Sequence, residues 1–228
     1  MRSTNALLTL ALATGIFLAQ VSVAQEPPSG GPPPGAPPGG APPAGAMRPA
    51  SKDPTAAPAG TYALDLEHHA VIARASHGGV SFSVLRFAAK QGSLVWDPSN
   101  PGNSKLEVTV DAKPITDPIV YRIKIESDAM LDTAKFPEIK FVSTAVRALG
   151  GNRYEIDGQL TLLGMTKRAQ IQASFVGTGR RIPTGETTIG FTGSMNVNWP
   201  EYKGPGMANS VGVVTVGLDA EFIGAKAP

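Results

Sequence analysis

The stretch Ile156–Ser174, which reads IDGQLTLLGMTKRAQIQAS, decides the fold. In its second half, Ile171 and Ala173 alternate with glutamine residues. This period of two is typical of a β-strand with one buried face and one face in water. Gly164 stands between two apolar runs, where a tight connection needs the backbone freedom of glycine. The stretch therefore predicts a β-hairpin inside an antiparallel sheet.

Similar strand patterns recur along the chain after residue 61, separated by short turns. The expected strands cover 62–75, 80–87, 92–97, 106–111, 139–148, 154–163, 170–175, 187–198 and 211–223. Eight or nine strands at this spacing predict an all-β barrel or sandwich. Residues 118–135 break the pattern, because Ile119, Ile123 and Met130 among charged residues favour one or two short helical turns.

The first 60 residues differ from the rest. Residues 1–24 carry Arg2, an apolar run over 6–19 and small residues before Ala24, the layout of a secretory signal peptide. The run is shorter than the roughly 20 residues of a spanning helix. Residues 25–60 are rich in proline, glycine and alanine, which predicts a disordered linker, either an inert spacer or a tether to an envelope partner. Residues 61–228 are expected to form the folded domain.

Composition excludes several classes of protein. The chain has no cysteine, so it has no disulfide, no thiolate metal site and no lipoprotein anchor. Its formal net charge of +2 comes from scattered lysines and arginines, without the basic stripe of a nucleic-acid-binding protein. We therefore expect no nucleic-acid partner.

Three motifs together resemble a known family. The hairpin matches the pattern G-x-L-T-L-x-G-x-T-K over Gly158–Lys167, and an opening Y-x-[IL]-D-x-x-H is matched over Tyr62–His68. A central F-P-x-[IA]-x-F is matched over Phe136–Phe141. In this order the motifs resemble the YceI-like family of periplasmic, polyisoprenoid-binding, lipocalin-like proteins. Two stretches depart from the family pattern, at 122–125 and 199–203, which leaves the identity of the ligand open.

The resemblance implies an antiparallel, lipocalin-like, eight-stranded β-barrel with one or two short helical turns. It also implies a periplasmic or secreted protein that carries or stores an isoprenoid, a quinone or a similar amphiphile, including a role under envelope stress. A transient contact with the envelope membrane and a homodimer are further partners compatible with it. Such a protein is not an enzyme and needs no cofactor beyond the bound lipid.

Large apolar side chains on the expected strands are the candidates for lining a ligand cavity, although for each one taken alone ordinary core packing is the favoured interpretation. The candidate lining residues, with one histidine added, are Phe82, Phe87, Trp96, Phe141, Leu162, Phe175, Phe191 and His77. Trp199 and Tyr202 lie in a loop rich in proline and glycine, where they either cover the cavity mouth, touch a membrane or pack within the loop.

The three histidines, His68, His69 and His77, are clustered in the sequence. Neighbouring strand residues point to opposite faces, so His68 and His69 are not expected to bind one metal ion together. No nucleophile elbow or catalytic triad is evident. Two alternatives to a carrier remain: an enzyme that acts on the lipid, with His77 deep in the barrel, and an interaction protein whose barrel is filled by side chains.

Overall fold

The fold is taken from a computed structural model that describes residues 49–115, 118–182, 184–204 and 207–226. The expected signal peptide and the linker through residue 48 lie outside the described residues. Among those described, no helix combines the length and the apolar character that crossing a membrane requires.

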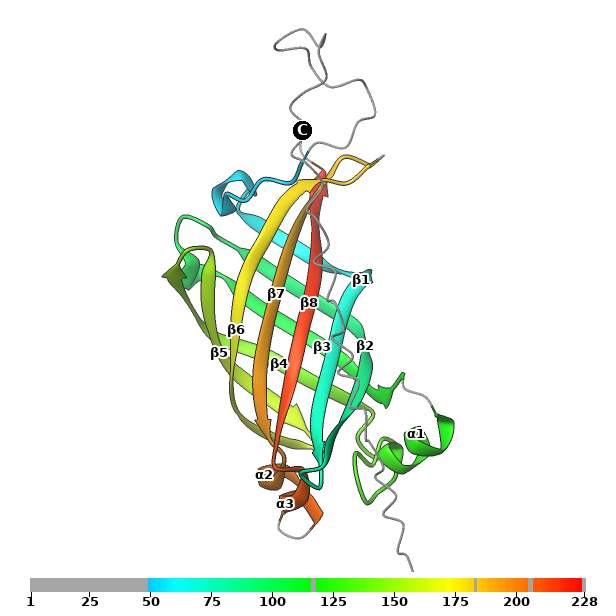
Figure 1. The fold of residues 1–228 in the computed structure, drawn as a ribbon. Helices are drawn as coiled ribbons and strands as arrows, with labels where there is room; N and C mark the ends of the chain where they lie inside the picture. Colours follow the sequence, from blue (N-terminus) through cyan, green and yellow to red (C-terminus); the bar gives the residue numbers. More distant parts are fainter. Residues whose placement is uncertain (1–48, 116–117, 183, 205–206, 227–228) are drawn as a thin grey trace, which may run out of the picture. The chain divides into compact units, whose positions relative to one another are not determined.

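Within the described residues, eight antiparallel strands close into a barrel in sequence order, with the last strand paired to the first (Figure 1). The strands are β1 (Gly60–His77), β2 (Ser81–Trp96), β3 (Lys105–Pro114), β4 (Glu138–Gly150), β5 (Arg153–Leu162), β6 (Met165–Arg180), β7 (Glu186–Asn198) and β8 (Val213–Lys226). Each strand pairs with its sequence neighbour, through tight turns at β1–β2, β4–β5 and β5–β6 and through longer connections with short helices at β3–β4 and β7–β8. The predicted eight-stranded barrel is confirmed.

Short helices occupy the connections. They are the 3₁₀ turns η1 (Pro54–Ala56) and η2 (Pro101–Asn103), and the helices α1 (Ile119–Glu126), α2 (Trp199–Lys203) and α3 (Met207–Val211). α1 falls in the stretch where helical turns were predicted. The expected loop around Trp199 and Tyr202 instead contains α2, in which Pro200 occupies an N-terminal helical position that proline favours.

β2 corrects one detail of the sequence analysis, which expected separate strands at 80–87 and 92–97. The structure has one continuous strand whose register shifts between Phe87 and Gln91. Such a bulge adds a residue without ending the strand, and it reverses which residues point inward. Phe87 before the bulge and Leu94 and Trp96 after it are therefore all buried, although their spacing breaks strict alternation.

The hairpin between β5 and β6 explains why its sequence is distinctive. Leu163 and Gly164 both have positive φ, 53° and 71°, as a type I′ turn requires. A Cβ on Gly164 would also lie 2.7 Å from Cε1 of Phe136. Glycine is thus required at 164 both for its backbone conformation and for the close approach of the Phe136 ring.

The two ends of the barrel differ. At the end where β1 starts and β2 ends, Trp96, Tyr154, Phe175, Phe191 and Phe222 form a cluster of aromatic rings with centroids 5.4–6.4 Å apart. We call this the closed end. The three α-helices and the β1–β2 hairpin gather at the opposite end (Figure 1).

A segment ahead of β1 belongs to the barrel, although the sequence analysis included it in the linker. Ser51 pairs with Thr178 of β6, and Nζ of Lys52 donates to the Val176 carbonyl at 2.6 Å. Ala57 is fully buried. The hydroxyl of Tyr62 donates to the carbonyl of Pro58 at 2.7 Å. These contacts tie residues 51–58 to the closed end.

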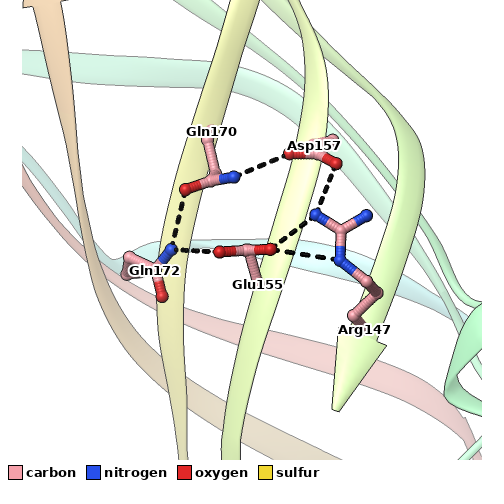
Figure 2. A network of polar contacts seen from close by, with 5 residues as sticks. All are labelled: Arg147, Glu155, Asp157, Gln170 and Gln172. Atoms are coloured by element: carbon pink, nitrogen blue, oxygen red, sulfur yellow. Dashed lines mark hydrogen bonds and ion pairs between the residues drawn. The ribbon is translucent and has the colours of Figure 1, made fainter. Parts of the chain in front are cut away.

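The outer face of β4, β5 and β6 carries a network of polar side chains (Figure 2). Arg147 donates to Glu155 and Asp157, and Gln170 and Gln172 donate to the same two carboxylates from the next strand. These cross-strand pairs favour one register over its neighbours, because a slip by one residue would turn every polar group toward the interior.

Candidate functional site

The interior of the barrel holds a cavity of about 920 Å³. Aliphatic side chains from strands all around the barrel form its wall, among them Leu85, Val108, Ile139, Leu160, Ile171 and Met195. The volume lies at the upper end of the roughly 300–1,000 Å³ typical of ligand pockets. An apolar wall offers a favourable environment to an apolar ligand and little to a polar one.

Aromatic rings form the floor of the cavity at the closed end. Trp96 is only 2% exposed and meets Tyr154 and Phe191 edge to face, with centroids 5.5 and 5.4 Å away. Its indole N–H has no hydrogen-bond partner among the described residues. A ligand therefore meets a packed apolar floor.

The mouth lies at the opposite end, where the lining residues are exposed. His77, Gly78 and Val80 of the β1–β2 hairpin form one part of the rim, and Val80 is 89% exposed. Lys124 of α1 and Ser210 of α3 line the cavity from other sides. The rim thus carries charged and polar groups, while the wall and floor are mainly apolar, with His69 among their few polar residues.

α2 covers part of the mouth. Trp199 lines the cavity and is 6% exposed, and Tyr202 is equally buried. The hydroxyl of Tyr202 donates to the Leu160 carbonyl at 3.4 Å, and burial raises the pKa of this phenol. Of the interpretations considered for this pair, contact with a membrane is wrong because both rings are buried. Trp199, at the start of α2, contributes its side chain to the cavity wall at the mouth end.

Six of the eight candidate lining residues line the cavity: His77, Phe87, Trp96, Phe141, Leu162 and Phe191. Phe82 does not. Before the bulge in β2, the odd-numbered side chains such as Leu85 and Phe87 point inward, so the even-numbered Phe82 points outward. It is 61% exposed, and the Arg74 guanidinium lies 4.7 Å from the centre of its ring. Phe175 points inward but stacks on Trp96 at 6.2 Å, beneath the floor.

The histidines separate as strand geometry requires. His69 lines the cavity, and its Nε2 accepts the Ala89 backbone N–H at 2.9 Å. Because Nε2 is an acceptor, Nδ1 carries the proton in the neutral ring. His77 lies at the exposed rim rather than deep in the barrel, so the expectation for an enzymatic His77 is wrong about its position. Sequence reasoning missed His69, although alternation with His68 would have placed it inward.

His68 faces outward into a cluster at a bulge of β1. Nδ1 of His68 and Nη1 of Arg181 each lie 2.9 Å from Oδ2 of Asp65, which is 5% exposed. Burial alone would raise the pKa of Asp65, but hydrogen bonds from His68 and the Glu67 N–H, with the charge of Arg181, lower it overall. The hydrogen bond and the charge of Asp65, followed by the charge of Glu221, raise the pKa of His68.

Asp65, His68 and Glu221 are also close enough together to hold a metal ion, with candidate ligand atoms within 4.8 Å of one another. The Arg181 guanidinium already bonds the same Asp65 oxygen that His68 contacts. A cation would have to compete with that charge, so the cluster is better described as an ion-pair network. Asp65 and His68 are three residues apart, but Glu221 comes from β8, far along the chain, which is why spacing did not reveal the set.

Comparison with known proteins agrees with this architecture. The model of the YceI-like domain matches residues 62–222. The chain belongs to the YceI-like family. It is 37% identical over 175 residues to a UPF0312 protein of Pseudomonas savastanoi pv. phaseolicola, covering 75% of this chain and 88% of that protein. A UPF0312 protein of Shewanella sp. strain ANA-3 is 38% identical over 164 residues, or 68% and 85% of the two chains.

Among solved structures, Burkholderia cenocepacia BcnA superposes with a TM-score of 0.59 at 21% identity, covering 69% of this chain and 98% of BcnA. This likeness supports the fold alone. Within the YceI-like barrel, the three motifs have separate structural places. The opening motif forms the Asp65–His68 bulge outside the wall, while the other two supply the cavity residues Phe141 and Leu162.

Proposed function

We propose that this YceI-like protein is exported to the periplasm, where it holds an isoprenoid or a similar long-chain amphiphile inside its barrel. It acts as a carrier or store and catalyses no reaction. The N-terminal sequence, with Arg2 and the apolar run over 6–19, supports export. The lack of cysteine is compatible with an exported barrel that needs no disulfide.

The observation that carries the proposal is the cavity of about 920 Å³, whose wall is mainly apolar. The alternative of a barrel filled by side chains predicts no such cavity and is wrong. Burial of each methylene contributes about 0.8 kcal/mol, so a long chain can bind tightly with few polar contacts. Binding is then passive desolvation of an apolar tail.

The distribution of polar groups indicates the orientation of the ligand. The floor is closed by Trp96 and Phe222, which are 2% and 4% exposed. His77, Lys124 and Ser127 line the cavity near the mouth. An apolar tail therefore enters first, and a polar head stays at the rim, because a buried polar group without partners costs free energy.

Native mass spectrometry of the protein as isolated, combined with organic extraction, tests this proposal. We expect a stoichiometric isoprenoid or related amphiphile. Protein stripped of lipid should take up added polyprenyl lipid from detergent, with a change in the fluorescence of Trp96 and Trp199, the only two tryptophans. An empty barrel that also takes up none of the added lipid would contradict the proposal.

A further inference from the structure

Two elements at the mouth end of the barrel carry exposed apolar side chains, which we call the rim patch: Val80, Phe82 and Val84 of the β1–β2 hairpin, with Ile119, Val120 and Ile123 of α1. Val80, Phe82, Val120 and Ile123 are the four most exposed large apolar side chains among the described residues, at 89%, 61%, 61% and 60%. Scattered exposed apolar residues are ordinary, but a cluster at one functional end marks an interaction surface.

α1 has two apolar faces. Its inner face carries Ile125, which is 4% exposed, and Tyr121, which lines the cavity. At 3.6 residues per turn, Ile119, Val120 and Ile123 share an arc of about 100° on the outer face. Packing against the barrel explains the inner face. Nothing among the described residues covers the outer one.

Basic side chains flank this outer face on both sides. Arg122 and Lys124 lie on opposite edges of the apolar arc. Arg122 also forms an ion pair with Glu126, with its Nε 3.6 Å from Oε1 of the carboxylate. On the hairpin, the guanidinium of Arg74 lies over the Phe82 ring. Long basic side chains can keep their charges at lipid headgroups while their stems and apolar neighbours enter the acyl boundary.

From these observations we propose that the rim patch docks the mouth of the barrel on a phospholipid bilayer with anionic headgroups. The inference rests on the proposed function, since an apolar tail that moved through water would lose about 0.8 kcal/mol per exposed methylene. The patch lies on the two elements that carry Val80, Tyr121 and Lys124 to the opening, so docking lets the tail pass from bilayer to cavity without crossing water.

Co-sedimentation with vesicles tests the docking surface. The protein starting at Gln25, as export would leave it, is mixed with phosphatidylcholine vesicles with and without phosphatidylglycerol. We expect it to bind the anionic vesicles more tightly. The helix variant Ile119→Gln/Val120→Gln/Ile123→Gln should bind them about tenfold or more weakly, because the lost apolar burial is multiplied over three side chains.

A second variant and a matched control guard against misfolding. Phe82→Thr/Val84→Thr weakens the hairpin half of the patch while keeping strand-forming residues. The control Leu149→Thr/Val176→Thr changes side chains that are 46% and 45% exposed on β4 and β6, toward the closed end. We expect the control to bind vesicles like the unchanged protein.

The inference is overturned if the unchanged protein does not bind anionic vesicles, or if both patch variants bind as well as the control. It is also overturned if the patch variants instead convert a dimer to a monomer, which would assign the patch to a second copy of the chain. Uptake of polyprenyl lipid from detergent separates the two proposals. Vesicle binding without any uptake would contradict the carrier function and leave the docking surface standing.

Discussion

At the scale of single residues, two contacts between glycine and an aromatic ring join β4 and the segment just before it to the hairpin of β5 and β6. The Phe136 ring lies on Gly164, and the Phe141 ring lies on Gly158, where a Cβ would be 2.4 Å from Cζ of Phe141. Phe141 is 6% exposed and lines the cavity. The absent side chain of Gly158 therefore sets the position of one wall of the cavity.

Gly158→Ala should destabilise the protein by about 1–3 kcal/mol, the usual cost of an overpacked core. The ring of Phe141 or the backbone of Val142, whose carbonyl would be 2.6 Å from the new Cβ, must move. Urea denaturation measures the effect. Gly179→Ala is the control, since a Cβ there meets nothing within 4 Å. Equal losses for the two variants would contradict the argument.

The pH dependence of stability should report the ion pair of His68 with Asp65. Because folding raises the pKa of His68, the ion pair contributes fully to the free energy of unfolding below about pH 6.5, the ordinary pKa of histidine. That contribution is lost as the pH rises through the folded-state pKa of His68. The melting temperature should therefore fall as pH rises above that value. His68→Gln should remove this part of the fall, whereas His77→Gln, at the exposed rim, should retain it. Identical pH profiles for both variants would refute this role.

Residue-scale predictions from sequence succeeded where alternation was regular and failed at bulges. Phe82 shows the reason. Inside and outside alternate along a strand, but the register shifts of β1 and β2 decide which set is inside. A bulge depends on hydrogen bonds with the neighbouring strand, so it has no clear signature in one sequence. Phe82 was therefore predicted inward and lies outward.

At the scale of elements, the segment before β1 is an integral part of the barrel. Nδ2 of Asn152, in the β4–β5 turn, donates to the Lys52 carbonyl at 2.7 Å, and Ala57 is fully buried. The proline- and glycine-rich composition of 25–60 predicted disorder for the whole range. Composition could not show that residues 51–58 pack on a preformed surface, because the partners lie on β6 and in a distant turn.

A chain that starts at Gly60 should be less stable than one that starts at Pro49 by about 1–2 kcal/mol. It loses several hydrogen bonds, each worth about 1 kcal/mol net, less the chain entropy that it regains. Differential scanning calorimetry of the two chains measures the difference. A chain that starts at Pro49 but carries Lys52→Met separates the side-chain bond to Val176 from the rest. Equal melting temperatures for the chains starting at 49 and 60 would show that the segment contributes nothing.

At the scale of the whole molecule, the barrel has a closed aromatic end and an open polar rim around one apolar cavity. Strand number and closure followed from periodicity and the family resemblance. The cavity itself could not be predicted, because the same inward residues would fill a narrower barrel. Its existence depends on small residues in the wall, such as Ala73 and Ala173, which leave space between larger neighbours.

Substitution by phenylalanine should have opposite effects on stability at two buried alanines. Ala73 lines the cavity, whereas Ala112, which is 1% exposed, does not. Ala73→Phe places a ring in empty volume, so it should stabilise lipid-free protein by about 1–2 kcal/mol through added apolar burial. The same ring occupies room that a tail needs, so uptake of polyprenyl lipid should fall.

Ala112→Phe should instead destabilise the protein by about 1–3 kcal/mol, since it inserts the same ring into a packed wall without adding to the cavity contents. Urea denaturation of both variants, after organic extraction of bound lipid, gives the two free energies of unfolding. Uptake from detergent is then measured for each variant that folds. If Ala73→Phe lowered stability as much as Ala112→Phe, the space beside Ala73 would be filled in the protein. If it gained stability yet took up lipid normally, the ligand would bind elsewhere, and the carrier proposal would lose the cavity that supports it.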